Sequence, residues 1–97
     1  MVKHMIIWKL QELGGIEEQK RAIKEALEGL VGKIDGLLEM HILTECLPVS
    51  SGDLMMDSLF ASTDALAAYQ KHPLHVEIAN THVRPVADVR LSFDYEV

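Results

Sequence analysis

The sequence predicts an α+β fold of the ferredoxin-like type, with the element order βαββαβ. Three observations lead to this class. The first segment, Val2–Leu10, is a mostly apolar run of strand-like composition, and in the last, Val86–Tyr95, apolar residues alternate with Asp88, Arg90, Ser92 and Asp94. A glycine pair and then a helical pattern follow the first run, and two further strand-like runs precede a second helical region. This order predicts a four-stranded antiparallel sheet with its helices on one face.

The composition is that of one globular domain. The 97 residues are 48% hydrophobic and 25% charged, and 15 acidic against 9 basic residues give a net charge of −6. This charge argues against a nucleic-acid partner, and no apolar run approaches the ~20 residues of a membrane span. The single cysteine, Cys46, follows Glu45 and has no adjacent cation, so we expect a buried small hydrophobe and not a nucleophile. We expect one domain over residues 1–97, no membrane partner, and a reducing, cytoplasmic location.

The predicted strand Val2–Leu10 has an apolar middle in both of its registers. A strand with one solvated face alternates between apolar and polar side chains, so we expect this strand to be covered on both faces. One register consists of Val2, His4, Ile6, Trp8 and Leu10, and the other of Lys3, Met5, Ile7 and Lys9.

A helix is predicted from roughly Glu17 to Ile34. Acidic residues in its first turn interact favourably with the helix dipole, and Asp35-Gly36 ends it. Apolar residues recur at three- and four-residue spacing, which indicates one buried stripe. The stripe consists of Ile16, Ile23, Ala26, Leu27, Leu30, Val31 and Ile34, and the solvated side of Lys20, Arg21, Lys24, Glu25 and Glu28.

The remaining elements follow from turn and proline signals. Leu37–Leu47 is the second predicted strand, ended by Pro48, and a short loop leads to the antiparallel third strand, Asp53–Ala61. A short helix follows the N-cap candidates Ser62–Asp64. His72-Pro73 breaks that helix, and a second short helix, about Leu74–His82, precedes the last strand.

This layout leaves one face of the sheet without helices. Met5, Ile7 and residues of the two middle strands would place an apolar patch there in water. Packing the sheet against that of a second copy removes the patch, so we expect a homodimer through the sheet faces.

Histidine is the only residue type with an unusual count, at five. His72 and His75 frame Pro73, but H-x-x-H alone is a weak metal signal, because it lacks the glutamate and the five-residue span of the metalloprotease motif. We therefore expect no metal site, and we interpret His41 and His82 as capping or surface histidines. From the residues alone, His72 and His75 could equally bond backbone groups at the helix break.

Three segments carry a resemblance to a known family. They are V-K-H-M-I-I-W-K-L, L-F-A-S-T-D-A-L-A-A-Y-Q-K-H-P-L-H-V and S-F-D-Y-E-V. Together they resemble the stress-responsive dimeric α+β barrel (Dabb) domain over essentially the whole chain. The resemblance implies a ferredoxin-like protomer whose sheet packs on that of its twin to form a barrel across the dimer.

The resemblance also implies site residues. The family is mostly of undefined function, but it includes a plant polyketide cyclase that works without metal or organic cofactor. By similarity to that enzyme, His75 would take a proton from an acidic carbon, and Tyr69 would orient it or bond the substrate oxygen. His4 would be a polar contact of a pocket that Ile6 and Trp8 also line.

Two further features of the family stay open for this chain. His72 is an additional candidate for substrate binding, through the same H-P-x-H segment. Some members hold a magnesium ion on main-chain oxygens of a turn that corresponds to Val31, Ile34 and Leu37, and nothing in the sequence demands one here.

Two functions are therefore expected. The first is a small-molecule-binding or stress-related homodimer of undefined activity. The alternative is a cofactor-independent enzyme, of cyclase, isomerase or monooxygenase type, that uses His75 and Tyr69 for proton transfer on a small carbonyl or aromatic substrate. A pocket beside these two residues would favour the enzyme, and a filled core would favour the first reading.

Overall fold

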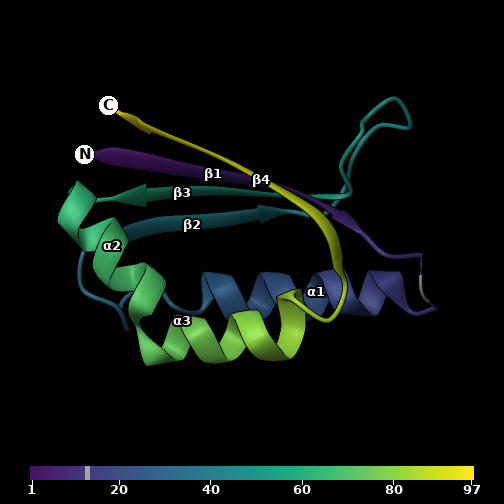
Figure 1. The fold of residues 1–97 in the computed structure, drawn as a ribbon, viewed down its shortest axis with the longest axis horizontal. Coiled ribbons are helices and arrows are strands. Elements are labelled where there is room, and N and C mark those ends of the chain that lie inside the picture. The colour runs from purple at the N-terminus through teal and green to yellow at the C-terminus, as the bar shows by residue number, and fades with distance from the viewer. Residues whose placement is uncertain (13) are drawn as a thin grey trace.

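The computed structural model describes residues 1–12 and 14–97 as a sheet with one layer of helices (Figure 1). The strands are β1 (Val2–Leu10), β2 (Leu37–Leu43), β3 (Leu54–Phe60) and β4 (Ala87–Glu96). The helices are α1 (Ile16–Glu28), α2 (Thr63–Lys71), α3 (Pro73–Ile78) and its π-helical continuation η1 (Ala79–Val83). The strand order is β2-β3-β1-β4 with every neighbouring pair antiparallel, so the predicted ferredoxin-like βαββαβ fold is confirmed. None of the helices in these two ranges is long and apolar enough to cross a membrane.

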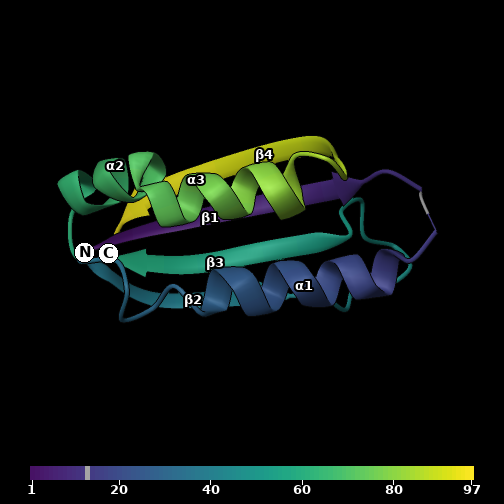
Figure 2. The same cartoon turned by 90° about the horizontal axis from the view of Figure 1, so that it is seen from below.

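Strand β1 lies in the middle of the sheet and has two different faces. His4, Ile6 and Trp8 are buried on the side of the helices, and each is at most 4% exposed. Ile7, on the opposite side, is 45% exposed. Figure 2 shows α1 along the β2 half of the sheet and α3 along the β4 half, so β1 runs beneath the space between them.

Helix α1 ends six residues earlier than the sequence analysis expected. It stops at Glu28, because Gly29 caps it and Gly32 then takes the left-handed conformation at φ 88°. Leu30 and Ile34, which the sequence assigned to the last turns, are still buried, in the connection that follows the helix. Four members of the predicted stripe, Ile23, Leu27, Leu30 and Ile34, are therefore buried as expected, whereas Val31 is 42% exposed and the helix is shorter than expected.

Strand β2 also ends earlier than expected, at Leu43 and not Leu47. Its last pairing joins Leu43 to Met55, and a turn at Leu47 to Ser50, around Pro48, begins the return to β3. Cys46 consequently lies in the loop and is exposed, so the expectation of a buried cysteine was wrong.

The edge strand β2 is tied to α1 by charged side chains. The Glu28 carboxylate accepts a hydrogen bond from the Ile42 N–H at 2.8 Å, and Lys24 Nζ donates to the Ile42 carbonyl at 3.0 Å. Lys20 Nζ donates to the Thr44 carbonyl at 3.2 Å. Lys20 is buried and not on a solvated side as expected, because its aliphatic stem crosses apolar surface to reach this edge.

The sheet face opposite the helices is largely apolar. Strand β4 places its apolar register there and its polar register toward the helices. The large apolar side chains that remain at least 42% exposed on this face are Ile7, Leu43, Val89, Leu91, Phe93 and Tyr95. The β2–β3 loop rises above the same face, away from the helix layer (Figure 1). The open face is therefore an uncovered hydrophobic surface of the kind that another protein surface normally covers.

Gly36 is a position that accommodates a side chain poorly, for two separate reasons. Its φ is 84°, and a Cβ built there would lie 2.5 Å from Cβ of Ala65. We expect Gly36→Ala to lower the free energy of unfolding by about 2–4 kcal/mol, from left-handed strain and from the clash. Chemical denaturation measures this value.

Gly32→Ala is the matched control. Its φ is 88°, but a Cβ there meets no described atom within 4 Å, so only the strain of about 1–2 kcal/mol applies. Ala65→Gly should recover part of the loss in the Gly36→Ala background. Equal losses for Gly36→Ala and Gly32→Ala would show that the contact with Ala65 is unimportant.

Candidate functional site

A cavity of about 340 Å³ lies between the sheet and the helix layer. Five of the six candidate residues line it, and only His72 does not. Strand β1 contributes three of them, and the helical segment on either side of the His72-Pro73 break contributes the other two. The lining candidates are His4, Ile6, Trp8, Tyr69 and His75.

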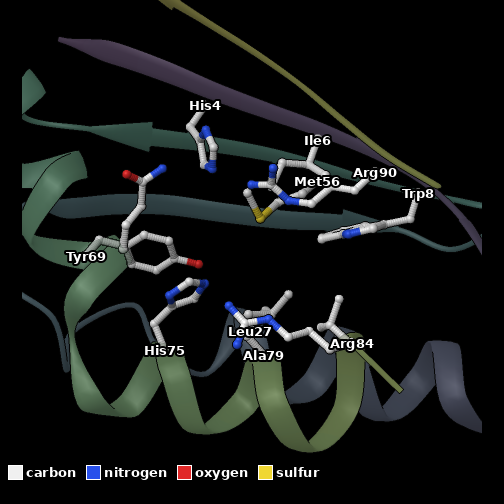
Figure 3. A pocket seen from close by; sticks show the side chains of 12 residues that line it. His4, Ile6, Trp8, Leu27, Met56, Tyr69, His75, Ala79, Arg84 and Arg90 are labelled. Atoms are coloured by element: carbon white, nitrogen blue, oxygen red, sulfur yellow. The ribbon is translucent and has the colours of Figure 1, made fainter. Parts of the chain in front are cut away.

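Tyr69 and His75 meet because the helix breaks between them. His72 has extended backbone, Pro73 begins α3, and the chain turns so that Tyr69 in α2 and His75 in α3 face each other. Their ring centroids are 4.2 Å apart with an interplanar angle of 33°, and the Phe60 ring packs against Tyr69 with a centroid distance of 4.9 Å. Figure 3 shows the Tyr69 hydroxyl pointing into the cavity beside the His75 ring.

Both of these side chains carry a polar atom without a partner. Tyr69 is 1% exposed, and within residues 1–12 and 14–97 neither its hydroxyl nor Nδ1 of His75 has a hydrogen-bond partner of normal geometry. Burying a polar group unpaired costs about 1–3 kcal/mol. A ligand oxygen or nitrogen in the cavity would supply the missing partners.

Burial changes the protonation of the pair. It lowers the pKa of His75 below 6.5, and the nearby Gln70 carbonyl only partly opposes this effect. It raises the pKa of Tyr69, because the phenolate would lose its hydration. At neutral pH the site therefore holds a neutral imidazole, which accepts a proton, beside a protonated phenol, which donates a hydrogen bond.

His4 is held by two groups on neighbouring strands. Its Nδ1 pairs with the Asp94 carboxylate of β4, the residue directly opposite it in the sheet. Ser58 Oγ of β3 donates to the His4 carbonyl at 2.6 Å. Because a carboxylate accepts a hydrogen bond, Nδ1 donates to Asp94, and Nε2 lies on the cavity side (Figure 3).

The remaining histidines lie outside the cavity. His72 Nδ1 accepts a hydrogen bond from the Leu74 N–H at 3.1 Å and caps α3, which gives it a local role at the break. His41 lies on the open face of β2, with Nε2 3.2 Å from a Glu39 carboxylate oxygen. In the part of the chain that the structure describes, no group of three His, Cys, Asp or Glu side chains could hold a metal ion.

Three charged residues of the site were not named from the sequence. Asp94 pairs with His4, and Arg84 and Arg90 line the cavity. The alternation of Val86–Tyr95 did place Arg90 and Asp94 on one face of a strand. The missing information was that β4 pairs with β1, which turns this polar face toward the helices.

Comparisons with known proteins agree with this fold. The model of the stress-responsive A/B barrel domain (Dabb) family matches residues 2–97. No curated protein sequence matches the chain. A dimeric protein of unknown function from Bacteroides fragilis, with a ferredoxin-like fold, is 27% identical with a TM-score of 0.88, and the match covers 99% of this chain and 95% of that one.

Two plant proteins are also similar in structure. An Arabidopsis thaliana protein is 25% identical with a TM-score of 0.85, over 100% of this chain and 95% of that one. A hydroxynitrile lyase from Passiflora edulis is 17% identical with a TM-score of 0.81, over 99% and 92%, and so shares the fold. Since the family model spans nearly all 97 residues, the chain belongs to the stress-responsive A/B barrel domain family.

Proposed function

We propose that this protein is a homodimeric, cofactor-independent enzyme that moves a proton on a small molecule containing a carbonyl group. One observation carries the proposal: the buried Tyr69 hydroxyl has no partner among the described residues and points into a cavity beside the neutral His75. A core without a cavity beside Tyr69 and His75 would instead have favoured a protein without catalytic activity. The hydroxynitrile lyase from Passiflora edulis has the same fold and is an enzyme, which supports this choice.

The arrangement supports the following proton transfer. The neutral His75 takes a proton from a carbon next to a carbonyl group, so the C–H bond breaks and its electron pair moves to the carbonyl oxygen. The Tyr69 hydroxyl donates a hydrogen bond to that oxygen as its charge develops. The His75 imidazolium then returns the proton to the same carbon or to another atom of the substrate. Nε2 of His4, whose ring Asp94 holds in place, lies across the cavity as a further polar contact for the substrate.

The proposal also includes the cellular compartment and the biological role of the protein. The single cysteine, Cys46, forms no disulfide within the chain, which supports a reducing, cytoplasmic compartment. The stress-related role that the family suggests stays a prediction. A binding protein without turnover is the alternative, and the kinetic experiment below separates the two.

The catalytic prediction concerns His75 and Tyr69. We expect the protein to accelerate deuterium incorporation next to the carbonyl of aryl ketones such as acetophenone in D₂O, followed by ¹H NMR. His75→Ala should lower that rate by about 100- to 10,000-fold, and Tyr69→Phe by about 10- to 100-fold, because only one hydrogen bond is lost.

His41→Ala is the control for removing a histidine, since His41 lies on the open face of β2 and should not affect exchange. A His75→Ala variant that exchanges as fast as the wild type contradicts the catalytic role. If wild-type protein binds the ketones in a thermal-shift assay but produces no exchange, the binding protein is the correct reading.

The pH dependence follows from the lowered pKa of His75. A base works in its neutral form, and burial keeps His75 neutral below its ordinary pKa of 6.5. We therefore expect the exchange rate to stay constant as the pH falls to 6.5 and to decline only as the pH passes through the lowered value. A decline centred at or above pH 6.5 would point to an exposed histidine as the base.

The dimer prediction concerns the open face of the sheet. Ile7 is central in the apolar patch, and an aspartate there would bury an unpaired charge in a sheet-to-sheet interface. We expect Ile7→Asp to shift the protein from dimer to monomer in sedimentation experiments at micromolar concentration. Val31→Asp is the control, since Val31 is similarly exposed at 42% but follows α1. A wild-type monomer, or a dimer that Ile7→Asp leaves intact, contradicts the interface.

A further inference from the structure

Two of the three arginines in this chain line the same cavity. Arg84 follows η1 in the helix layer, and Arg90 lies on β4. Within residues 1–12 and 14–97, neither forms an ion pair with a carboxylate. The chain has 15 acidic residues against 9 basic ones, so carboxylates are abundant. Both arginines are solvent-exposed residues of the cavity lining, so an anion that enters the cavity can reach their guanidinium groups.

The two side chains approach the cavity from opposite walls. Arg90 stands opposite Trp8 in the sheet register, on the helix side of β4, and Arg84 reaches in from the helix layer (Figure 3). Arg84 Nη1 donates to the Asn80 side-chain oxygen one turn earlier, which positions its guanidinium group. Guanidinium groups bind carboxylates through paired hydrogen bonds, so this placement suits a planar anion between the walls.

A third donor lies in the same part of the cavity. Trp8 is 3% exposed, and its indole Nε1–H has no acceptor within the described residues. The indole can only donate, so its missing partner must be an acceptor. The Asp94 carboxylate of the site is already paired with His4. An incoming anion would satisfy the Trp8 donor together with the two arginines.

The other residues that line the cavity indicate the size and the polarity of the rest of the ligand. Ile6, Leu27, Met56 and Val83 are apolar and provide the body of the cavity. Its volume of about 340 Å³ is at the lower end of the range for small-molecule sites, about 300–1,000 Å³. A free phosphate would leave this apolar surface unused, whereas a carboxylic acid with an apolar body fills both parts.

We infer that the cavity selects a small organic carboxylate, held by Arg84, Arg90 and the Trp8 indole N–H, with its apolar body toward Tyr69 and His75. This inference deepens the proposed function, because it names the substrate class as a carboxylic acid whose reacting carbon lies beside the Tyr69–His75 pair. The binding step can be tested without turnover.

The test compares a matched pair of probes, 3-phenylpropanoate and 3-phenylpropanamide, by calorimetric titration of the wild-type protein. We expect the acid to bind about tenfold more tightly than the amide at low salt, and the difference to shrink as salt is added. Arg84→Gln and Arg90→Gln should each weaken binding of the acid by about tenfold and leave the amide unchanged. Arg21→Gln, on the exposed side of α1, makes the same charge change and should alter neither.

Several results would overturn the inference. They are equal affinity for acid and amide, no binding of either probe, or an equal loss in Arg21→Gln, which would reflect net charge alone. Inorganic phosphate that binds as tightly as the acid would show a general anion site instead. If the acid binds through the arginines but no exchange chemistry is found for any ketone, the proposed activity fails while the carboxylate site stands.

Discussion

The alternation of side chains along β1 is the constraint on which the rest of this structure depends. Strand β1 lies between β3 and β4, so it pairs with a strand on each side. Each of its side chains points either toward the helix layer or toward the open face of the sheet. His4, Ile6 and Trp8 form the floor of the cavity, and Met5 and Ile7 belong to the open face. A shift of one residue in its register would exchange the two sets, moving the site into water and the apolar patch under the helices.

The polar groups of the site come from elements that are distant in the chain, and each is held by its own local device. Asp94 on β4 holds the ring of His4 on the neighbouring strand β1. Asn80 positions the Arg84 guanidinium group from one helical turn earlier. The break at His72-Pro73 lets Tyr69 and His75 face each other. Such separate supports preorganise donors and acceptors before a ligand arrives, which is the arrangement that electrostatic catalysis requires.

The cavity combines a neutral base, His75, with two positively charged arginines, and this combination suits the proposed chemistry. Burial keeps the His75 imidazole neutral, and the positive groups Arg84 and Arg90 act in the same direction on its pKa. An anionic ligand between the arginines would partly remove that second effect and make His75 a stronger base. Binding and activation would then be coupled, because the same arginines that hold the ligand otherwise disfavour the imidazolium.

The sequence was sufficient for the parts of the structure that depend on local pattern. The order of the elements, the two faces of β1 and the helix break at Pro73 all follow from periodicity and from residues with restricted backbone conformations. Contacts between residues that are distant in the sequence could not be predicted from it. The pairing of Asp94 with His4 and the position of Arg84 at the cavity are known only once the fold is known. The early end of α1 was also missed, since the apolar spacing continues past Gly29 although the helix does not.

The side chains that bind the backbone of β2 have a consequence for how molecules of this protein can associate. An exposed strand edge is a template on which a further chain can add a strand. Here Lys24 and Glu28 already occupy the backbone groups of Ile42, on the β2 edge of the sheet. A strand added along this edge would have to forgo pairing at Ile42 or displace two charged side chains of a helix. These two residues of α1 therefore disfavour strand addition at one edge of every folded molecule.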